Sequence, residues 1–436
     1  MKGMSPFQLV VTGVFAAFII IGVAFFALFR GDGNSGPISN LTVWGFMTEP
    51  TFNSILESAG VSEDPSLNVT KYTQVDPTTF DRDFVEALAR GESPDVVMIP
   101  HTSLIRQRDK IFPIPYESYS QRNFQNTFIE GGELFLSEEG ILAVPFILDP
   151  LVMYWNRTMF SNAGIATPPQ FWDEFFNLTQ QMVKKDPAFN ITQSAIAFGG
   201  YQNVTNAKEI LSALIMQAGS PITSRSEDKI KSSLLERFNQ PIIPAEAAVN
   251  FYTEFSNPVN NFYSWNRSLP NSQDYFISGD LATYFGLASE VGLINTKNPN
   301  LNFDAAVLPQ SRGGAEVITF ANMAGLSIPK ASRDVAGAFR LISTLTSQSS
   351  LNGASQITGL PPVRRDLLSE KPSDPFFAIF YDSALWSRAW FDPGDSQTEE
   401  IFQIMIEDVT SGRESISGAL SRASSRLQAL LSNVSF

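Results

Sequence analysis

Hydrophobic residues are distributed along the chain in two ways. A single run near the N-terminus, Leu9–Phe29 (LVVTGVFAAFIIIGVAFFALF), contains no charged residue. As a helix, its 21 residues span about 31 Å, which matches the hydrocarbon core of a membrane. No second run of comparable length follows, so we expect the remaining residues to form one soluble body outside the membrane.

Two interpretations of this run compete, a cleaved signal peptide and a permanent anchor. The run is longer than the apolar core of a usual signal peptide, about 7–15 residues, and the segment Ala24–Ala27 offers no good cleavage site. Anchoring as a lipoprotein would need a Cys after the run, and the chain has none. We therefore expect residues 1–30 to be an uncleaved transmembrane anchor, with the globular body on the extracytoplasmic face of the cell membrane. Residues 31–39 (GDGNSGPIS) are expected to be a flexible tether.

Strand and helix signals alternate after the tether. The pattern predicts strands at 41–46, 67–74 and 95–99, and helices at 49–59 and 79–90, the second of which ends at Gly91. Further on, Thr167-Pro168-Pro169 has the residue types that open a helix, and the pattern predicts strands at 303–308 and 325–329 and helices at 331–345 and 415–431. Apolar strands that alternate with helices indicate an α/β fold with a parallel sheet covered on both faces. About 400 residues are too many for one core, so two lobes are expected.

Composition and charge exclude several classes of function but say less about the fold. The net charge is −14, and clustered Lys and Arg are needed to bind nucleic acid, so no nucleic-acid partner is expected. The chain has no Cys and one His, His101, which excludes disulfides, thiolate metal sites and Cys nucleophiles. A Ser-His-Asp triad could use only His101, and a metal site would need carboxylates alone. We expect no cofactor, no metal and no enzymatic activity.

Several segments, taken in order, resemble one known family. They are LTVWGF (41–46), FVEALARGESPDVVMIPHTSL (84–104), GILAVPFILDPLVMYWNRTMFSNAGIATPPQFWDEF (140–175), FISGDLATYFG (276–286), DAAVLPQ (304–310), GLSIPKASRDVAGAFRLISTLTS (325–347) and TGLPPVRRDLL (358–368). The chain is similar across 40–434 to the extracellular solute-binding proteins of ABC importers, specifically the maltose-binding-like, sugar-binding branch. It departs from the family's usual anchoring, because no Cys is present for a lipid.

This resemblance implies a two-lobed clamp of the type II periplasmic-binding-protein fold, preceded here by the N-terminal transmembrane helix. The matched segments place lobe 1 at 40–147 plus 302–346 and lobe 2 at 148–301 plus 347–436. A carbohydrate would bind in the cleft between the lobes, and the closed form would deliver it to the permease subunits of an ABC importer. Sheets of this class bind ligands at the carboxyl ends of their strands.

Candidate ligand contacts follow from those strand ends and from the family's pattern. Trp44 and Gly45 end the first strand, where an indole could stack on a sugar face or could belong to the core. His101 and Thr102 follow the 95–99 strand directly, although a lone His is more often structural. Asp149 matches the position of an acidic sugar ligand in the family, and its carboxylate could accept two hydrogen bonds from neighbouring hydroxyls, or it could be a surface turn residue.

The second lobe supplies the other candidates. A polar loop (GGYQNVTNAKE) contains Tyr201, Asn203 and Asn206, which could bind hydroxyls or face solvent. Tyr284 and Ser289 stand at and after the segment GDLATYF, where the cleft of the family often contains an aromatic or a small residue. Trp386 and Trp390 stand at helical spacing, which favours packing on one face over a stacking role in the site.

Three functions remain open at this stage. The first is a membrane-tethered receptor of a carbohydrate importer, which the resemblance favours. The second is a surface sugar-binding or sensing protein that works without a permease, since the same clamp serves both. The third is an anchored carbohydrate-active enzyme, which would need a carboxylate pair that the sequence does not offer.

Overall fold

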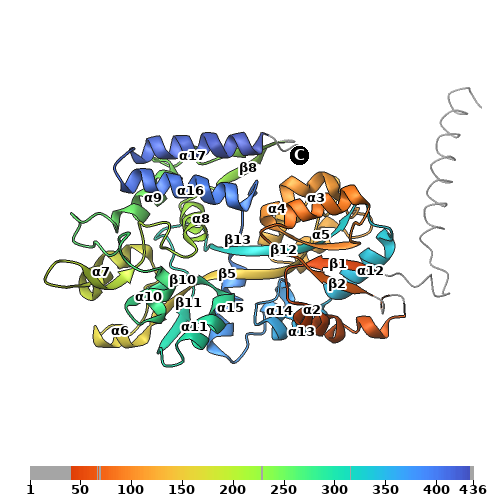
Figure 1. Cartoon of the computed structure of the whole chain (residues 1–436), viewed down its shortest axis with the longest axis horizontal. Coiled ribbons are helices and arrows are strands. Elements are labelled where there is room, and N and C mark those ends of the chain that lie inside the picture. The colour runs from red at the N-terminus through yellow and green to blue at the C-terminus, as the bar shows by residue number, and fades with distance from the viewer. Residues whose placement is uncertain (1–40, 66, 68–69, 227–228, 315, 433–436) are drawn as a thin grey trace, which may run out of the picture.

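Two α/β lobes, joined through one long mixed sheet, make up the computed structural model (Figure 1). The structure describes residues 41–65, 67, 70–226, 229–314 and 316–432. The apolar run Leu9–Phe29 and the tether 31–39 lie outside these residues. Within the described ranges, no helix combines the length and the apolar character that crossing a membrane requires.

The first lobe is built around three parallel strands. β1 (Thr42–Gly45) lies between β2 (Lys71–Gln74) and β3 (Val96–Pro100). Helices cover this part of the sheet: α2 (Glu49–Ser58), α3 (Phe80–Arg90), α4 (His101–Gln107), α5 (Gln121–Thr127), α12 (Val335–Leu345), α13 (Gln348–Thr358) and α14 (Arg365–Leu368). Short elements complete the lobe: β4 (Ile111–Phe112) and the 3-10 turns η1 (Val61–Glu63), η2 (Arg108–Lys110) and η3 (Glu130–Phe135).

The second lobe continues the sheet. Its strands are β6 (Lys184–Lys185), β7 (Ile191–Ile196), β10 (Leu281–Leu287) and β11 (Phe303–Ala306), with a separate hairpin of β8 (Thr223–Ser226) and β9 (Lys229–Ser232). Its helices are α6 (Arg157–Asn162), α7 (Phe175–Met182), α8 (Ala207–Gln217), α9 (Pro244–Glu254), α10 (Ser272–Ile277), α11 (Val291–Lys297), α15 (Pro375–Leu385), α16 (Asp395–Thr410) and α17 (Ile416–Leu431), with 3-10 turns η4 (Trp172–Glu174) and η5 (Ala288–Glu290).

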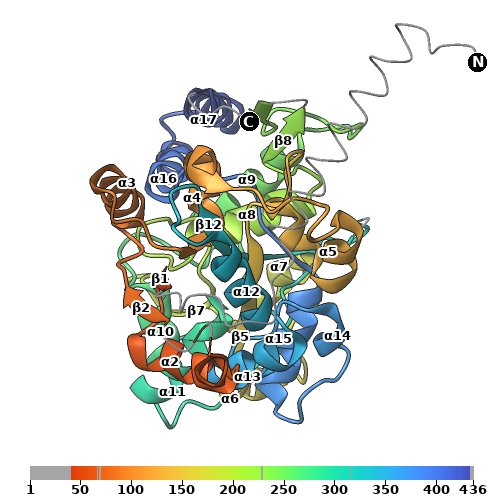
Figure 2. The same ribbon diagram turned by 90° about the vertical axis from the view of Figure 1, so that its right-hand side faces the viewer.

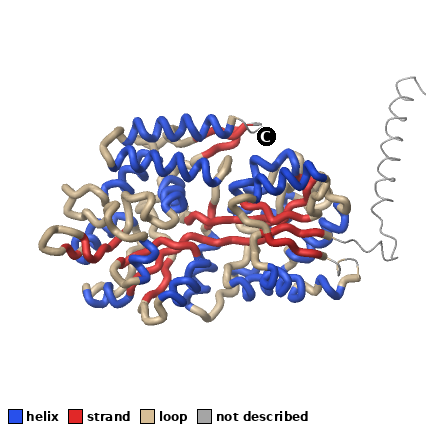
Figure 3. Tube along the Cα trace, viewed as in Figure 1, coloured by secondary structure: helices blue, strands red, loops and turns tan. Residues whose placement is uncertain are grey.

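Two long antiparallel strands, β5 (Val144–Asn156) and β12 (Thr319–Pro329), run through both lobes (Figure 3). On β5, the side chains up to Leu148 belong to the first hydrophobic core and those from Leu151 onward to the second. On β12 the change falls between Phe320 and Ala321. We call residues 148–150 and 320–322 the boundary segment. The short strand β13 (Ser387–Arg388) pairs with β12 beside it.

Several residues in the later part of the chain pack in a different core from the one expected from the sequence, which placed 302–346 in lobe 1 and 347–436 in lobe 2. Phe303, Ala305 and Leu308 pack in the second core, whereas Leu351 and Val363 pack in the first. Helix α15 contributes to both, because Phe380 points into the second core and Tyr381 into the first. The chain therefore passes between the two cores again at β12 and near α15.

Several local signals act as the sequence predicts. Helix α3 ends at Gly91, whose φ of +72° suits a residue without a side chain. The predicted helix at Thr167-Pro168-Pro169 is wrong, because the helical turns begin only at Trp172 and become α-helical at Phe175. Just before them, Phe171 is extended and forms a β-bridge with Gln310, in which Gln170 and Trp172 make the backbone hydrogen bonds to Gln310.

Candidate functional site

The carboxyl ends of strands from both lobes converge on the boundary segment. In the first lobe, parallel β1 and β3 end at Gly45 and Pro100, and Pro100 pairs with Ala324 of β12. In the second lobe, parallel β7 and β10 end on the same side, and Leu287 at the end of β10 pairs with Leu151 of β5. Ligands of open α/β sheets bind at such edges, so the candidate site lies around the boundary segment.

Asp149 occupies the centre of this arrangement. It pairs with Asn322 of β12, and its Oδ1 accepts a hydrogen bond of 3.0 Å from the backbone N–H of Ser289 in the second lobe. Burial of the carboxyl raises the pKa of Asp149 to about 6, although the bonds from Ser289 oppose this shift. The side chain keeps partial contact with solvent, and Ser289 is exposed. These two residues, predicted from different segments, are in direct contact.

Trp44 and Gly45 lie at the carboxyl end of β1, as predicted. Trp44 is partly exposed, whereas Gly45 is buried against Tyr72. A Cβ at Gly45 would stand 2.8 Å from the hydroxyl oxygen of Tyr72, so packing within the lobe already requires a glycine here. Trp44 thus keeps part of its surface exposed to solvent. Packing against Tyr72 is sufficient to explain why residue 45 is a glycine.

His101 and Thr102 form the first turn of α4. His101 is 2% exposed, and its Nδ1 lies 3.4 Å from both the N and the O of Met323 on β12. Burial lowers the pKa of His101, which keeps the imidazole neutral near pH 7. Thr102 is partly exposed. Of the two, Thr102 presents the more accessible side chain.

The side chains of Asn206 and Tyr284 belong to a hydrogen-bond network within the protein. The Glu290 carboxylate accepts bonds from Asn206 Nδ2 at 2.7 Å, from Gln273 Nε2 at 2.6 Å and from the Tyr284 hydroxyl. Asn206 stands just before α8 with a φ of +60°. Both predicted residues therefore support the end of β10 from within the protein.

Tyr201 and Asn203 are also bonded internally. The Tyr201 hydroxyl donates to the carbonyl of Glu399 at 3.1 Å. Asn203 donates through Nδ2 to the carbonyls of Asn266 and Leu269, each at 3.0 Å, and its Oδ1 accepts from Trp265 Nε1. The polar loop is thus built as a scaffold for the second lobe.

Trp386 and Trp390 differ in their surroundings. Helix α15 ends at Leu385, so Trp386 follows the helix and the two indoles do not share a helical face. Trp390 is 2% exposed, donates from Nε1 to the Ser212 hydroxyl at 3.1 Å and stacks on Phe402. Trp386 is partly exposed. Trp390 belongs to the second core, and Trp386 is the accessible member of the pair.

The sequence interpretation missed a charged cluster at the start of α8. Lys208 Nζ lies 3.0 Å from Asp392 Oδ2, with the two side chains 2% and 1% exposed. Lys208 also contacts Asp395 and the Thr398 hydroxyl at the start of α16. Burial alone would lower the pKa of Lys208, but the attraction of Asp392 and Asp395 outweighs it and raises the pKa.

Two further carboxyl groups lie close to this cluster. Burial raises the pKa of Glu209 to about 7, although the Lys208 charge opposes the shift, and burial also raises the pKa of Glu399. The available sequence signal was a Lys-Glu pair in the first turn of an otherwise apolar segment, AKEILSALIMQ. Apolar neighbours of that kind indicate that charged groups are buried and need partners.

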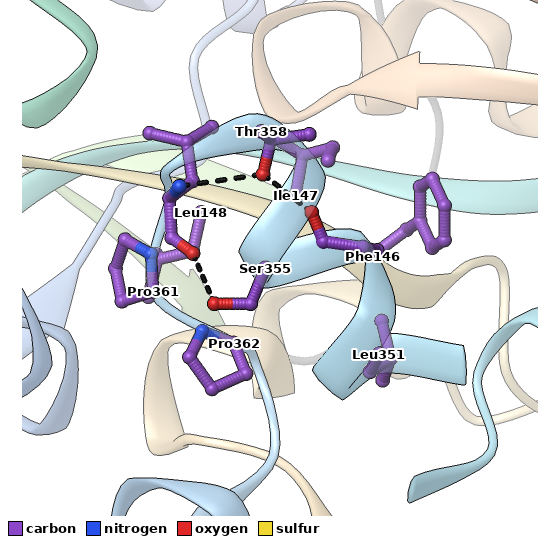
Figure 4. A pocket seen from close by; sticks show the side chains of 10 residues that line it. Phe146, Ile147, Leu148, Leu351, Ser355, Thr358, Pro361 and Pro362 are labelled. Atoms are coloured by element: carbon purple, nitrogen blue, oxygen red, sulfur yellow. Dashed lines mark hydrogen bonds between the residues drawn. The ribbon is translucent and has the colours of Figure 1, made fainter. Parts of the chain in front are cut away.

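A small cavity lies beside β5, just before Asp149 (Figure 4). It opens to solvent and is lined by Phe146–Leu148 of β5, by α13 and by the turn Leu360–Pro362. Its polar groups are paired: the Ser355 hydroxyl donates to the carbonyl of Leu360, and the Leu360 N–H donates to the Thr358 hydroxyl. The remaining lining is apolar, and the cavity contains none of the predicted site residues.

Comparisons with known proteins agree with this architecture. No curated protein sequence matches the chain. Among solved structures, a cyclo/maltodextrin-binding protein with maltotetraose has a TM-score of 0.73 at 17% identity, covering 91% of this chain and 98% of the other. The sugar-binding protein MalE from Xanthomonas citri has a TM-score of 0.72 at 18% identity, covering 91% and 98%. A mannobiose-bound protein, CpMnBP1, has a TM-score of 0.66 at 18% identity, covering 89% and 99%.

These likenesses establish the two-lobed periplasmic-binding-protein fold. At the level of sequence, residues 69–377 match the family model described as bacterial extracellular solute-binding protein. That match spans well over half of the chain. The chain therefore belongs to the family of bacterial extracellular solute-binding proteins.

Proposed function

We propose that the protein is a membrane-tethered extracellular receptor that captures a carbohydrate between its two lobes and delivers it to an ABC import permease. Membership of a solute-binding family supports capture of a small solute in preference to catalysis. The structural neighbours include proteins solved with maltotetraose, mannobiose, mannotriose and tagatose. A sugar is accordingly the class of ligand we propose for this chain.

The observation that carries the proposal is the position of Asp149. Its carboxylate stands on β5 at the boundary segment, contacts Ser289 of the second lobe and keeps partial exposure. A carboxylate has about four acceptor positions, so it can bind protein N–H groups and sugar hydroxyls together. Because β5 belongs to both cores, a ligand bound at Asp149 would contact both lobes.

Partly exposed aromatic groups complete the proposed site. Trp44 comes from the first lobe and Trp386 from the segment beside β13, and Thr102 adds a hydroxyl. Indole faces stack on the apolar face of a sugar ring while polar groups bind its hydroxyls. The buried candidates His101, Tyr201, Asn203, Asn206, Tyr284 and Trp390 would act by shaping the site, with Gly45 packing behind Trp44.

We further propose that the two hydrophobic cores move as two bodies about the boundary segment. β5 and β12 cross between the cores there, and β13 lies beside them. Strand residues at such a crossing can absorb the change in backbone angles that closure requires. The apolar run Leu9–Phe29 would hold these bodies at the membrane, with residues 31–39 reaching up to about 30 Å.

Calorimetric titration of the purified chain with maltotetraose, mannobiose and tagatose tests the ligand class, with leucine and glutamate as non-sugar comparisons. Binding of one sugar should raise the stability of the fold by about 2.7 kcal/mol at a concentration 100 times the dissociation constant. If an amino acid binds and no sugar does, the carbohydrate assignment is wrong. Co-purification of the membrane-extracted chain with permease subunits tests delivery.

A further inference from the structure

Helix α4 belongs to the first lobe but also contacts the second. Leu104 packs in the first hydrophobic core, whereas the next residue, Ile105, packs in the second. Ile105 is 2% exposed. One side of this helix therefore lies against the other lobe. In Figures 1 and 2, α4 and the start of α16 lie side by side on one side of the sheet.

Arg106 extends this contact beyond Ile105. Its guanidinium forms an ion pair with Asp81 of α3, and Asp81 also accepts from the Ser103 hydroxyl at 3.1 Å and from Gln107 Nε2 at 2.7 Å. Three side chains of α4 thus converge on a single carboxylate of α3. This arrangement fixes the direction of the Arg106 side chain.

The guanidinium of Arg106 packs against Gly394 of the second lobe. A Cβ on Gly394 would stand 2.9 Å from both Cζ and Nη1 of Arg106, so the guanidinium lies directly on the backbone at this glycine. Gly394 precedes α16 with a φ of +154°, and its N–H donates to Asp392 at 2.8 Å. Asp392 in turn binds the buried Lys208. The turn Asp392–Asp395 is therefore anchored within the second lobe, and Arg106 is anchored within the first.

One buried polar atom makes this contact less favourable. Among the described residues, the buried Nε of Arg106 finds no hydrogen-bond partner. Water could reach this atom if the lobes separated, so hydration favours separation while packing of Ile105 and Arg106 favours contact. A contact with opposing terms of this kind can be made and broken.

We propose that α4 and the turn Asp392–Asp395 form an interlobe latch, in which Arg106, positioned by Asp81, holds Gly394 and so stabilises the arrangement with touching lobes. This inference rests on the proposed function, because a latch has a role only if the lobes open and close. The contact of Arg106 with Gly394 is made near the end of α4, whereas His101 at the start of α4 contacts β12. The ion pair of Arg388 with Glu130 at 2.7 Å, by contrast, sits beside β12 and would move little.

Distances between spin labels test the latch without any ligand. The chain contains no Cys, so Ala89→Cys on α3 and Ser425→Cys on α17, both at exposed positions, place one label in each lobe. Double electron–electron resonance on the full chain in detergent then reports the distance between lobes. Arg106→Ala and Asp81→Asn should each raise the ratio of long to short distances about fivefold or more, a typical coupling between states. The matched control is Arg82→Ala, an exposed ion pair of α3 that does not reach the second lobe.

Gly394→Ala provides a test from the other lobe, since its Cβ would displace the guanidinium; it should shift the distances in the same direction. Melting of each variant by circular dichroism shows whether it is folded, and Arg106→Lys, which keeps the charge, should restore part of the short-distance population. If Arg106→Ala and Gly394→Ala are folded and have the distance distribution of the unsubstituted chain, there is no latch. Because no sugar is used, a chain that fails to bind carbohydrate would leave this outcome unaffected.

Discussion

Lys208 and Asp392 form an ion pair in the interior of the second lobe, with Nζ and Oδ2 3.0 Å apart, although the two residues are 184 positions apart in the chain. The pair ties the first turn of α8 to the segment before α16. Asp392 also accepts from the Gly394 N–H and contacts the Thr398 hydroxyl, so the buried charge has a full set of partners. The same pair anchors the turn that contacts α4.

Removal of one member of this pair should strongly destabilise the fold. Lys208→Ala leaves Asp392 buried without its counter-charge, so we expect a loss of about 3–5 kcal/mol in the free energy of unfolding. Urea unfolding followed by tryptophan fluorescence measures it. The control is Lys297→Ala, whose partner Asp274 is exposed, and which should cost about 1 kcal/mol or less. Equal losses in the two variants would contradict the prediction.

Asp149→Asn should weaken sugar binding while leaving the protein folded. The amide keeps the shape of the carboxyl but replaces one acceptor oxygen with a donor, so affinity should fall about 10- to 150-fold, the range expected for a charged hydrogen bond. Trp44→Ala should weaken binding through loss of stacking. Isothermal titration measures both, and wild-type affinity in both variants would show that the site is elsewhere.

The stability of the fold should carry a pH dependence that comes from Asp149. Its pKa is raised from 3.8 to about 6 in the folded protein, so the folded state binds more protons than the unfolded state between those values. The contribution of Asp149 to stability therefore falls as pH rises through about 4 to 6, by at most about 3 kcal/mol.

Asp149→Asn removes this dependence and leaves the other titrating groups in place. The melting temperature of the variant, relative to the wild type, should therefore rise between pH 4 and pH 7. The contribution of Glu209, whose pKa is also raised, is common to both proteins and cancels in the difference. A difference that stays constant over this range would mean that the carboxyl of Asp149 is not desolvated.

The two C-terminal tryptophans should separate stability from binding. Trp390→Ala opens a cavity beside Phe402 and leaves Ser212 without its donor, so it should cost about 3–5 kcal/mol of stability. Trp386→Ala should cost about 1 kcal/mol and lower sugar affinity about 2- to 10-fold through loss of stacking. Thermal melts and titrations on both variants measure the two effects, and a reversed pattern would exclude Trp386 from the site.

The N-terminal run should remain part of the mature protein. Leu9–Phe29 is long enough to span a bilayer and lacks a good cleavage site, so the protein should fractionate with membranes. N-terminal sequencing of the protein purified from its native membrane should find residues that precede Leu9. A mature sequence that begins near Arg30 would indicate a signal peptide instead.

Local periodicity and end signals were sufficient for many elements of the fold. The helix that ends at Gly91 and the apolar strand before Pro100 could be predicted because their patterns depend on neighbours a few residues away. Where the backbone pairs with a distant segment, the same signals failed. Thr167-Pro168-Pro169 are good helix-opening residue types, yet no helix begins there, and the backbone of Gln170 and Trp172 bonds to Gln310 instead.

Part of the candidate site could likewise be predicted from the sequence, and part of it depends on contacts between distant segments. Asp149 could be chosen from the sequence because its place in a matched segment corresponds to an acidic ligand of the family that the chain resembles, and the structure places it at the boundary segment. That it meets Ser289, 140 residues later, follows only from the pairing of β10 with β5. Trp386 and Trp390 are equivalent in the sequence pattern, and only the end of α15 and the packing of Phe402 distinguish them.

The sequence by itself determined the class of the fold, the two-lobed organisation and the polar residues at the strand ends, because hydrophobic period, turn residues and matched segments are all written along the chain. The tertiary structure decided which of those polar groups remain accessible and which are already bonded within the protein. It also decided that Lys208 finds Asp392 and that Arg106 reaches Gly394. Burial and electrostatic pairing depend on what surrounds a side chain in space, and residues far apart in the chain supply those surroundings.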